Sequence, residues 1–276
     1  MRTIIAHAHI FKNAGSTLDW SLQRCFGDDF LDHREDVLMI ERGGIHVREL
    51  LEEKPDLVAM SSHHMTVRMP EIEGVEIVPV YILRHPIERI ASVYEFERRQ
   101  EADTPGAQAA KKYDFKDYVE WRMQMGVSRT IRNHQALYVT GKFHAGNNHP
   151  LSFLILRDAV NRLRELPLVG VVEQYDEFMV VMEEYFRDSL PELDLSYVRQ
   201  NTSEIERPSG LSERVSAVLD QLGDLKQQVI DENAMDLALY QMGLRRMEQA
   251  IEEISDFDQK LAEFRARCAT VQEPRQ

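Results

Sequence analysis

The segment Ile77–Leu83 is apolar at almost every position, and it constrains the fold more than any other part of the chain. A short, continuously apolar run is typical of a strand that is covered on both faces, as strands are in parallel sheets flanked by helices. Arg84 and His85 follow, and Pro86 stands where a helix would begin, because proline favours the first helical position. We therefore expect a strand, a short loop and a helix over Ile87–Arg99.

The same order of elements occurs at the start of the chain. Thr3–Phe11 has the pattern of a short buried strand, Lys12–Gly15 of a loop, and Ser16–Phe26 of a helix with apolar residues at helical spacing. Asp56–Ser61 predicts another strand between these two units. Repeated strand–loop–helix units predict an α/β fold with a P-loop-like central parallel sheet flanked by helices.

The remaining pattern is mostly helical, so the C-terminal half is expected to be largely helical. Helices are predicted over Val47–Glu53, Tyr113–Met125, Ser128–Val139, Tyr175–Arg187, Ser212–Leu222 and Leu225–Met242, and loops over Gln100–Lys112 and Gly141–Pro150. Pro167 and Gly170 favour a strand over Leu168–Val172, whereas Leu151–Leu156 is compatible with either a strand or a buried helix.

One long final helix is predicted from an apolar stripe at steps of three and four residues. The stripe consists of Leu244, Met247, Ile251, Ile254, Phe257, Leu261, Phe264 and Cys268. A helix lying on its own domain is the favoured interpretation, and a homodimer seam is the alternative. We expect a single domain over residues 1–276, with an α/β core over 1–175, a mainly helical part over 176–269 and a loose tail over 270–276.

Composition limits the partners and the compartment. The chain has 47 acidic and 33 basic residues and a formal net charge of −14, so it is a poor general binder of nucleic acid or of anionic membranes. Its 2 cysteines, Cys25 and Cys268, are far apart, which argues against a disulfide scaffold and fits a reducing compartment. No signal-peptide core and no apolar run of roughly 20 residues is present, so we expect a soluble, cytoplasmic protein.

A first set of candidate binding residues lies between the first strand and the first helix. These residues are Lys12, Asn13, Ala14, Gly15, Ser16 and Thr17. Unpaired N–H groups at a helix start, the helix dipole, two hydroxyls and a lysine together make an anion site. The Walker pattern is absent, because the lysine precedes the glycine, and the alternative is an ordinary capped helix with a surface lysine.

A second set follows the strand Ile77–Leu83. Arg84 stands at the carboxyl end of this strand, where α/β sheets bind ligands, and Ser92 lies in the second turn of the next helix. A guanidinium and a hydroxyl can hold a second phosphate. A salt bridge is the alternative for Arg84, and a structural role is the favoured interpretation for Arg89.

Together the two sets resemble the sulfotransferases that use 3′-phosphoadenosine 5′-phosphosulfate (PAPS). The likeness is closest to carbohydrate sulfotransferases of the heparan sulfate 2-O-sulfotransferase type and extends over about Thr3–Met247. Weaker matches are Asn133-x-Gln135-x-x-Tyr138, Val169 to Asp176, Asn201 with Arg207-Pro208, and Glu232-Asn233 to Tyr240. Phe11 and Ala14 depart from the family, which often has proline and glycine there.

The resemblance implies a reaction and a role for each residue. The first loop would bind the 5′-phosphosulfate and stabilise the leaving phosphate through Lys12, and Arg84 with Ser92 would bind the 3′-phosphate. His64 matches the family's base better than His63, and Glu95 and Glu173 are alternative bases. No metal is required by this scheme. For His9 a packing or hydrogen-bonding role is expected.

The expected activity is transfer of a sulfuryl group from PAPS to a hydroxyl, most plausibly of a carbohydrate. The alternatives are an ATP-dependent P-loop kinase and a non-catalytic binding or assembly protein that uses the final apolar stripe. The missing Gly-Lys-Ser/Thr sequence and the lack of a clear acidic magnesium ligand argue against the kinase. Gln100–Lys112 and Gly141–Pro150 are the expected acceptor-binding loops, because loops on a rigid sheet carry specificity.

Overall fold

The structure is a computed structural model that describes residues 1–66, 68–142, 152–198 and 210–271. The chain divides into two compact units. Unit 1 comprises Met1–Leu83, Arg164–Thr202 and Gly243–Gln276, and unit 2 comprises Arg84–Leu163 and Ser203–Met242.

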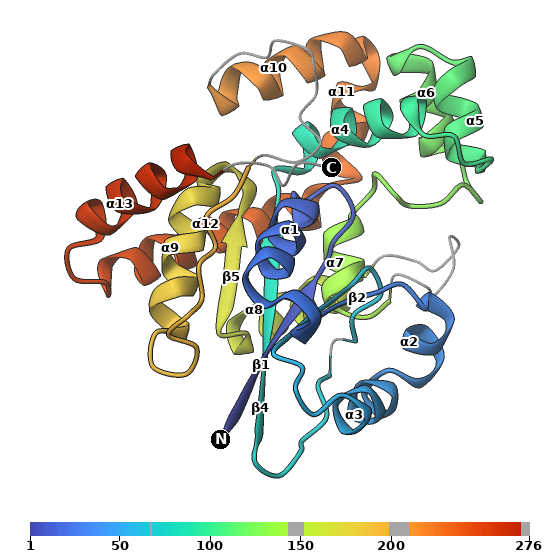
Figure 1. Cartoon of the computed structure of the whole chain (residues 1–276). Helices are drawn as coiled ribbons and strands as arrows, with labels where there is room; N and C mark the ends of the chain where they lie inside the picture. Colours follow the sequence, from blue (N-terminus) through green and yellow to red (C-terminus); the bar gives the residue numbers. More distant parts are fainter. Residues whose placement is uncertain (67, 143–151, 199–209, 272–276) are drawn as a thin grey trace. The chain divides into compact units, whose positions relative to one another are not determined.

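Unit 1 is built on a five-stranded, all-parallel sheet with the order β2-β3-β1-β4-β5 (Figure 1). Its strands are β1 (Arg2–Ala8), β2 (Phe30–His33), β3 (Ala59–Ser62), β4 (Val75–Leu83) and β5 (Leu168–Val171). Ile5 of the central strand is fully buried and pairs with Ala59 on one side and Val78 on the other. The predicted α/β fold with a central parallel sheet is therefore confirmed.

The strand order places a change of direction next to β1. The chain passes from β1 to β2 and β3 on one side of the sheet, and it then continues to β4 and β5 on the other side. Open α/β sheets bind ligands outside the carboxyl ends of the strands where the order changes direction in this way. The loop that follows β1 is thus in the position where a ligand is expected.

Helices cover the sheet of unit 1. They are α1 (Gly15–Phe26), α2 (Asp36–Arg42), α3 (Gly44–Glu53), α9 (Tyr175–Phe186), α13 (Phe257–Thr270) and the part of α12 (Ala234–Glu252) that follows Met242, with the short 3₁₀ turns η1 (Gly27–Asp29) and η2 (Val172–Gln174). Helix α1 contacts β2 and β3, α9 contacts β5, and α13 packs on α9 (Figure 1).

Unit 2 is helical. It contains α4 (Pro86–Arg99), α5 (Pro105–Lys112), α6 (Phe115–Met123), α7 (His134–Val139), most of α8 (Phe153–Glu165), α10 (Leu211–Leu222), η3 (Gly223–Leu225), α11 (Lys226–Asp231) and the start of α12. Helix α4 contacts α5, α6 and α10. A buried cluster joins two of these helices, because Arg122 of α6 pairs with Glu97 of α4 and Tyr118 donates to the same carboxylate.

Several predicted elements differ from the structure. The loop predicted over Gln100–Lys112 is wrong, because Pro105–Lys112 forms α5, whose N–H at Ala107 donates to the Thr104 hydroxyl. The helix predicted over Ser128–Val139 is confined to His134–Val139. Strand β2 and helix α2 were not predicted. The segment left open after Leu151 contains helix α8 from Phe153 onward, whereas Leu151 itself lies outside the described residues.

The long final helix predicted from the apolar stripe is two helices. Helix α12 ends at Glu252 and α13 begins at Phe257, and Asp256 between them has left-handed backbone at φ 55°. Leu261 and Phe264 of α13 are buried, and α13 packs on α9 of the same unit. The favoured interpretation of the stripe as an inward-facing surface agrees with this packing.

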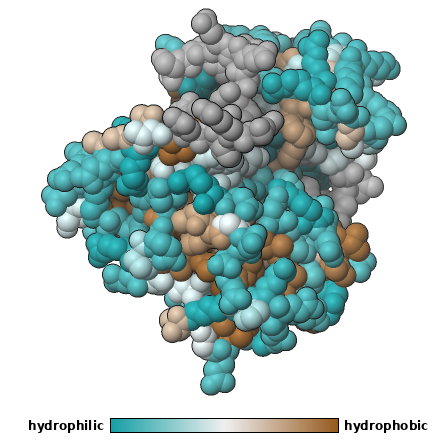
Figure 2. All heavy atoms as spheres, viewed as in Figure 1, coloured by the Kyte–Doolittle hydropathy of each residue, from teal (hydrophilic) through white to brown (hydrophobic). Residues whose placement is uncertain are grey.

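The surface is consistent with a chain that has 29% charged residues. Figure 2 shows a mostly hydrophilic face with apolar residues in scattered patches. Among the described residues, no helix has the length and the apolar character needed to cross a membrane.

Candidate functional site

The loop between β1 and α1 has an unusual backbone. Lys12 has φ 65° and Ala14 has φ 60°, so two non-glycine residues adopt the left-handed conformation within one short loop. Left-handed residues alternating with ordinary ones direct successive N–H groups to one side, and such concave sets of N–H groups bind anions. The conformation therefore fits the predicted anion-binding loop.

The start of α1 contributes further donors to this loop. The N–H of Thr17 donates to the Ala14 carbonyl at 3.1 Å, but within the described part of the chain the N–H groups of Gly15 and Ser16 have no hydrogen-bond partner. Unpaired N–H groups carry the positive end of the helix dipole. Ser16 is exposed beside them.

Asn13 has a different position from its neighbours in the loop. Its side chain is buried, and its amide donates to the carbonyl of Ile82 in β4 at 2.8 Å. Asn13 thus ties the loop to the adjacent strand of the sheet. Because the Asn13 side chain is buried and bonded to Ile82, the predicted contact with a cofactor would have to come from the Asn13 backbone.

Gly15 is required because it lies under the ring of His9. A Cβ atom at position 15 would lie 2.3 Å from Cδ2 and 2.6 Å from Nε2 of His9, distances that real Cβ atoms do not show. The φ of Gly15 is ordinary, so the constraint is space and not backbone conformation. Ala14 presents the opposite case, because its left-handed backbone would suit the glycine that the sulfotransferases often have there.

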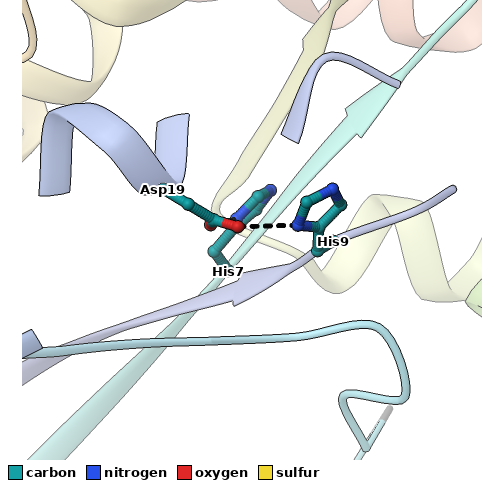
Figure 3. Close-up of side chains that lie close together, drawn as sticks. All are labelled: His7, His9 and Asp19. Carbon is teal, nitrogen blue, oxygen red and sulfur yellow. Dashed lines mark hydrogen bonds and ion pairs between the residues drawn. The ribbon is translucent and has the colours of Figure 1, made fainter. Parts of the chain in front are cut away.

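A buried cluster of two histidines and an aspartate holds the two ends of the loop together. Figure 3 shows Asp19 of α1 reaching toward His7 and His9 at the end of β1. Its two carboxylate oxygens lie 2.7 Å from Nδ1 of His7 and 2.7 Å from Nδ1 of His9. Ser61 of β3 lies 3.1 Å from His7 Nδ1, and Arg34 lies 3.6 Å from the carboxylate.

Burial and charge act against each other in this cluster. Burial of Asp19 favours its neutral form, but the charges and hydrogen bonds of His7 and His9 outweigh burial and hold the pKa of Asp19 well below its usual value. Burial lowers the pKa of His9 although the hydrogen bond that its Nδ1–H donates to Asp19 opposes this. Asp19 is therefore a carboxylate at neutral pH, and each Nδ1–H donates to it.

The same three residues are close enough to be considered as metal ligands. Their donor atoms lie within 4.8 Å of one another. Ligand atoms at about 2.0–2.1 Å from a tetrahedral zinc ion would lie roughly 3.3 Å apart. The two distances of 2.7 Å between carboxylate and imidazole are instead those of charge-assisted hydrogen bonds, and hydrogen bonding explains the arrangement as it stands.

The histidines after β3 are separated in the structure. The ring of His63 lies 4.2 Å from that of His9, and its Nδ1–H donates to the His9 carbonyl at 3.1 Å. The Nε2 of His64 lies 3.3 Å from Asp36 at the start of α2. Burial lowers the pKa of both, to about 4 for His63. The structure thus places His63 against the loop histidine and His64 against a carboxylate.

Unit 2 contains the second predicted set. The backbone of Arg84 is held by the side-chain amide of Gln135, which accepts from the Arg84 N–H and donates to its carbonyl, each at 2.9 Å. The guanidinium lies 3.4 Å from Glu88, which also pairs with Arg214 at 2.9 Å. Ser92 is half-buried in α4.

Arg89 has the structural role that the sequence favours. It is fully buried, and its guanidinium donates to the carbonyl of Thr130 at 2.7 Å. Burial lowers the pKa of Arg89 to about 10, so it stays charged at neutral pH.

Two of the weaker family-like segments meet in unit 2, which sequence analysis did not anticipate. Both oxygens of Asp236 accept N–H groups at the start of α7, from Gln135 at 3.0 Å and Ala136 at 2.8 Å. Asn133 donates to Asn233 at 3.1 Å and accepts from Met235. The position of Asp236 inside an apolar helical pattern was the sequence signal that could have indicated this contact. The family-like residues Asn201, Arg207 and Pro208 lie outside the described residues.

Comparison with known proteins gives a relationship that covers most of the chain. No protein-family model matches the chain. An uncharacterized protein of Archaeoglobus fulgidus is 31% identical over 246 residues, a match that covers 87% of this chain and 95% of the archaeal protein. At this identity and coverage, the chain belongs to the same protein family as the archaeal protein.

Proposed function

We propose that this protein is a sulfotransferase that transfers the sulfuryl group of PAPS to a hydroxyl of a carbohydrate. The observation that carries the proposal is the loop after β1. It combines Lys12, left-handed backbone at two positions and the unpaired N–H groups of Gly15 and Ser16, at the sheet edge where ligands bind. This loop supports the binding of a phosphate or sulfate group.

The transfer needs a stabilised leaving group and a base. The acceptor oxygen forms a bond to sulfur while the bond between sulfur and the phosphate oxygen breaks, which leaves 3′-phosphoadenosine 5′-phosphate (PAP). In this proposal Lys12 and the α1 N–H groups stabilise the charge on the departing phosphate. Ser16 and Thr17 supply hydroxyl groups. The proton of the acceptor hydroxyl passes to a histidine.

His64 is the base that the family resemblance favours. His63 is a second candidate for the base, because its ring lies next to the loop after β1. His63 donates through Nδ1, which leaves its Nε2 as the basic atom, and it lies against His9. The Nε2 of His64 lies 3.3 Å from the Asp36 carboxylate. His63→Gln and His64→Gln should be compared for turnover and PAP affinity, since only the base variant loses turnover while PAP binding survives.

The 3′-phosphate is assigned to Arg84 and Ser92 of unit 2. The double hydrogen bond with Gln135 fixes the backbone from which the Arg84 side chain extends. Arg84→Ala should weaken binding of PAP far more than binding of adenosine 5′-phosphate, which lacks the 3′-phosphate. Equal loss for both nucleotides would remove this assignment.

Thermal unfolding with added nucleotide tests the proposal as a whole. A ligand at about 100 times its dissociation constant adds roughly 2.7 kcal/mol, enough for a shift of several degrees. We expect a shift with PAP and none with ATP plus magnesium, followed by transfer of ³⁵S from labelled PAPS to a sugar. A shift only with ATP and magnesium would indicate a kinase, and no shift with either would indicate a non-catalytic binding protein.

Lys12→Gln is the decisive variant for the reaction itself. It removes the charge at the leaving phosphate, so turnover should fall by at least about a hundredfold. Lys54→Gln, at an exposed lysine that follows α3, is the matched control and should leave turnover unchanged. Retained turnover in Lys12→Gln would remove this lysine from the mechanism.

A further inference from the structure

His9 combines deep burial with a ring nitrogen that has no partner. The residue is only 5% exposed, and its Nδ1 donates to Asp19. Within the described residues, Nε2 has no hydrogen-bond partner. The ring lies on Gly15, the first residue of α1, where the unpaired N–H groups of that helix are found. Among the described residues, Nε2 of His9 is not one of the fully buried side-chain atoms without a partner, so it is open to solvent and can be reached by a ligand.

The charges around His9 come from every neighbouring element. On its own strand and loop are His7 and Lys12, and α1 contributes Asp19. Arg34 follows β2 and lies 3.6 Å from Asp19, and His63 follows β3 with its ring tilted by 50° against that of His9 at 4.2 Å. The buried hydroxyl of Tyr175 at the start of α9 also lies in the field of Asp19. Among the carboxylates that the structure describes, Asp19 is the one that hydrogen-bonds to His9.

We propose that His9 binds the 5′-phosphosulfate group of the nucleotide as an imidazolium, with Nε2–H donating to an anionic oxygen and Nδ1–H donating to Asp19. Nucleotide binding then takes up one proton from solvent. Asp19 acts as a positioning residue, and His7 holds the second oxygen of its carboxylate. This proposal rests on the proposed function, because it adds a ligand and a proton to the same nucleotide site.

The direction of the proton follows from the two states of the site. In the free protein, burial favours neutral His9, so the imidazole is uncharged at neutral pH and above. An anion beside Nε2 favours the imidazolium form of His9, as the Asp19 carboxylate at Nδ1 already does. The pKa of His9 must therefore rise when the anion binds, and affinity must fall as pH rises, by at most about tenfold per pH unit.

Calorimetric titration of the whole protein with PAP tests this coupling. At about pH 7.5, the enthalpy measured in two buffers of different ionisation enthalpy gives the number of protons exchanged, and we expect uptake of about one proton per PAP. Phosphate buffer is avoided because it competes for the site. Between about pH 6.5 and 8.5 the PAP dissociation constant should rise, and the NMR signal of the His9 ring should change to the imidazolium form on binding.

Three variants distinguish the proton site from its neighbours. His9→Asn keeps an amide near the position of Nδ1 but loses the Nε2 donor, so PAP affinity should fall at least about tenfold. His9→Gln can donate without titrating, so it should bind PAP with no proton uptake. Lys54→Gln, at an exposed lysine outside the site, is the control and should keep the proton uptake.

The outcomes separate this inference from the proposed function. PAP binding by the natural protein with no proton uptake would overturn the role of His9 and leave the sulfotransferase proposal standing. Loss of the proton uptake in His63→Gln but not in His9→Gln would assign the proton to His63 and also overturn it. Loss of PAP binding in EDTA would assign the cluster to a metal. No PAP binding under any condition would overturn both proposals.

Discussion

Two adjacent residues in the loop after β1 differ in why glycine would suit their position. Ala14 has the left-handed backbone that glycine adopts most easily, whereas Gly15 has ordinary backbone but no space for a Cβ. Sequence analysis identified Gly15 only as a member of the candidate anion-binding loop. The structure shows that its missing side chain makes room for the His9 ring.

Substitutions at these two positions should affect the stability of the protein to different extents. Gly15→Ala forces a Cβ into the His9 ring and should destabilise the protein by about 1–3 kcal/mol. Ala14→Gly relieves left-handed strain but adds flexibility to the unfolded chain, so its effect should stay within about 1 kcal/mol. Urea unfolding of both variants measures the difference. Equal stability of Gly15→Ala and the natural protein would show that the ring moves aside without cost.

The stability of the fold should depend on pH through His63. Burial lowers its pKa to about 4 in the folded chain, compared with about 6.5 when unfolded. Between these values the unfolded chain binds more protons, so stability increases with pH over this window and decreases as pH falls from about 6.5 to 4. His63→Gln should lose part of this dependence. Urea unfolding at about pH 7 and pH 5 compares the two proteins, and identical pH dependence would contradict the prediction.

Sequence analysis singled out the loop after β1 as a candidate anion site but missed the buried cluster beside it. Lys12, Gly15 and the hydroxyls are neighbours in sequence and match a known motif. Asp19 lies inside a helical pattern, where a single polar residue is normally solvated, so nothing marked it as buried beside His7. The alternation of His7 and His9 on one face of a strand, followed by an acid in the next helix, was the signal that could have indicated the contact.

At the scale of elements, the strongest patterns were predicted well and the short ones were missed. The strands β1, β4 and β5 and the helices α1, α4 and α9 were predicted within a few residues. Strand β2 is very short and contains Asp32 and His33, so it has no apolar run to detect. Helix α5 was hidden by its composition, because Pro105-Gly106 normally marks a turn but here proline occupies the first helical turn after the Thr104 cap.

Helix α13 should contribute to stability through its buried face. Phe264 is fully buried, and Arg267, Arg265 and Lys260 of the same helix pair with acidic residues of α9. Phe264→Ala should destabilise the protein by about 3–5 kcal/mol, whereas Glu263→Ala, at an exposed neighbour, should change little. Urea unfolding at two protein concentrations checks this. A midpoint that depends on concentration would instead indicate that this face joins two copies.

At the scale of the whole molecule, the net charge of −14 favours one kind of acceptor. A strongly negative protein repels a polyanion at long range, and salt screens this repulsion. Under the proposed function, neutral oligosaccharides should therefore be sulfated faster than a heparan-type polyanion, and the difference should shrink when salt is raised to about 0.3 M. Initial rates with both acceptors test this. Faster turnover of the polyanion at low salt would require a local basic acceptor groove.

The packing of His9 on Gly15 also has a consequence for the history of the family. A descendant with any side chain at position 15 would have to replace the imidazole at position 9, since the two cannot occupy the same space. Losing the imidazole would leave Asp19 with only one of its two histidines. Positions 9, 15 and 19 are therefore expected to change together among relatives, and the archaeal protein is the first place to look for that covariation.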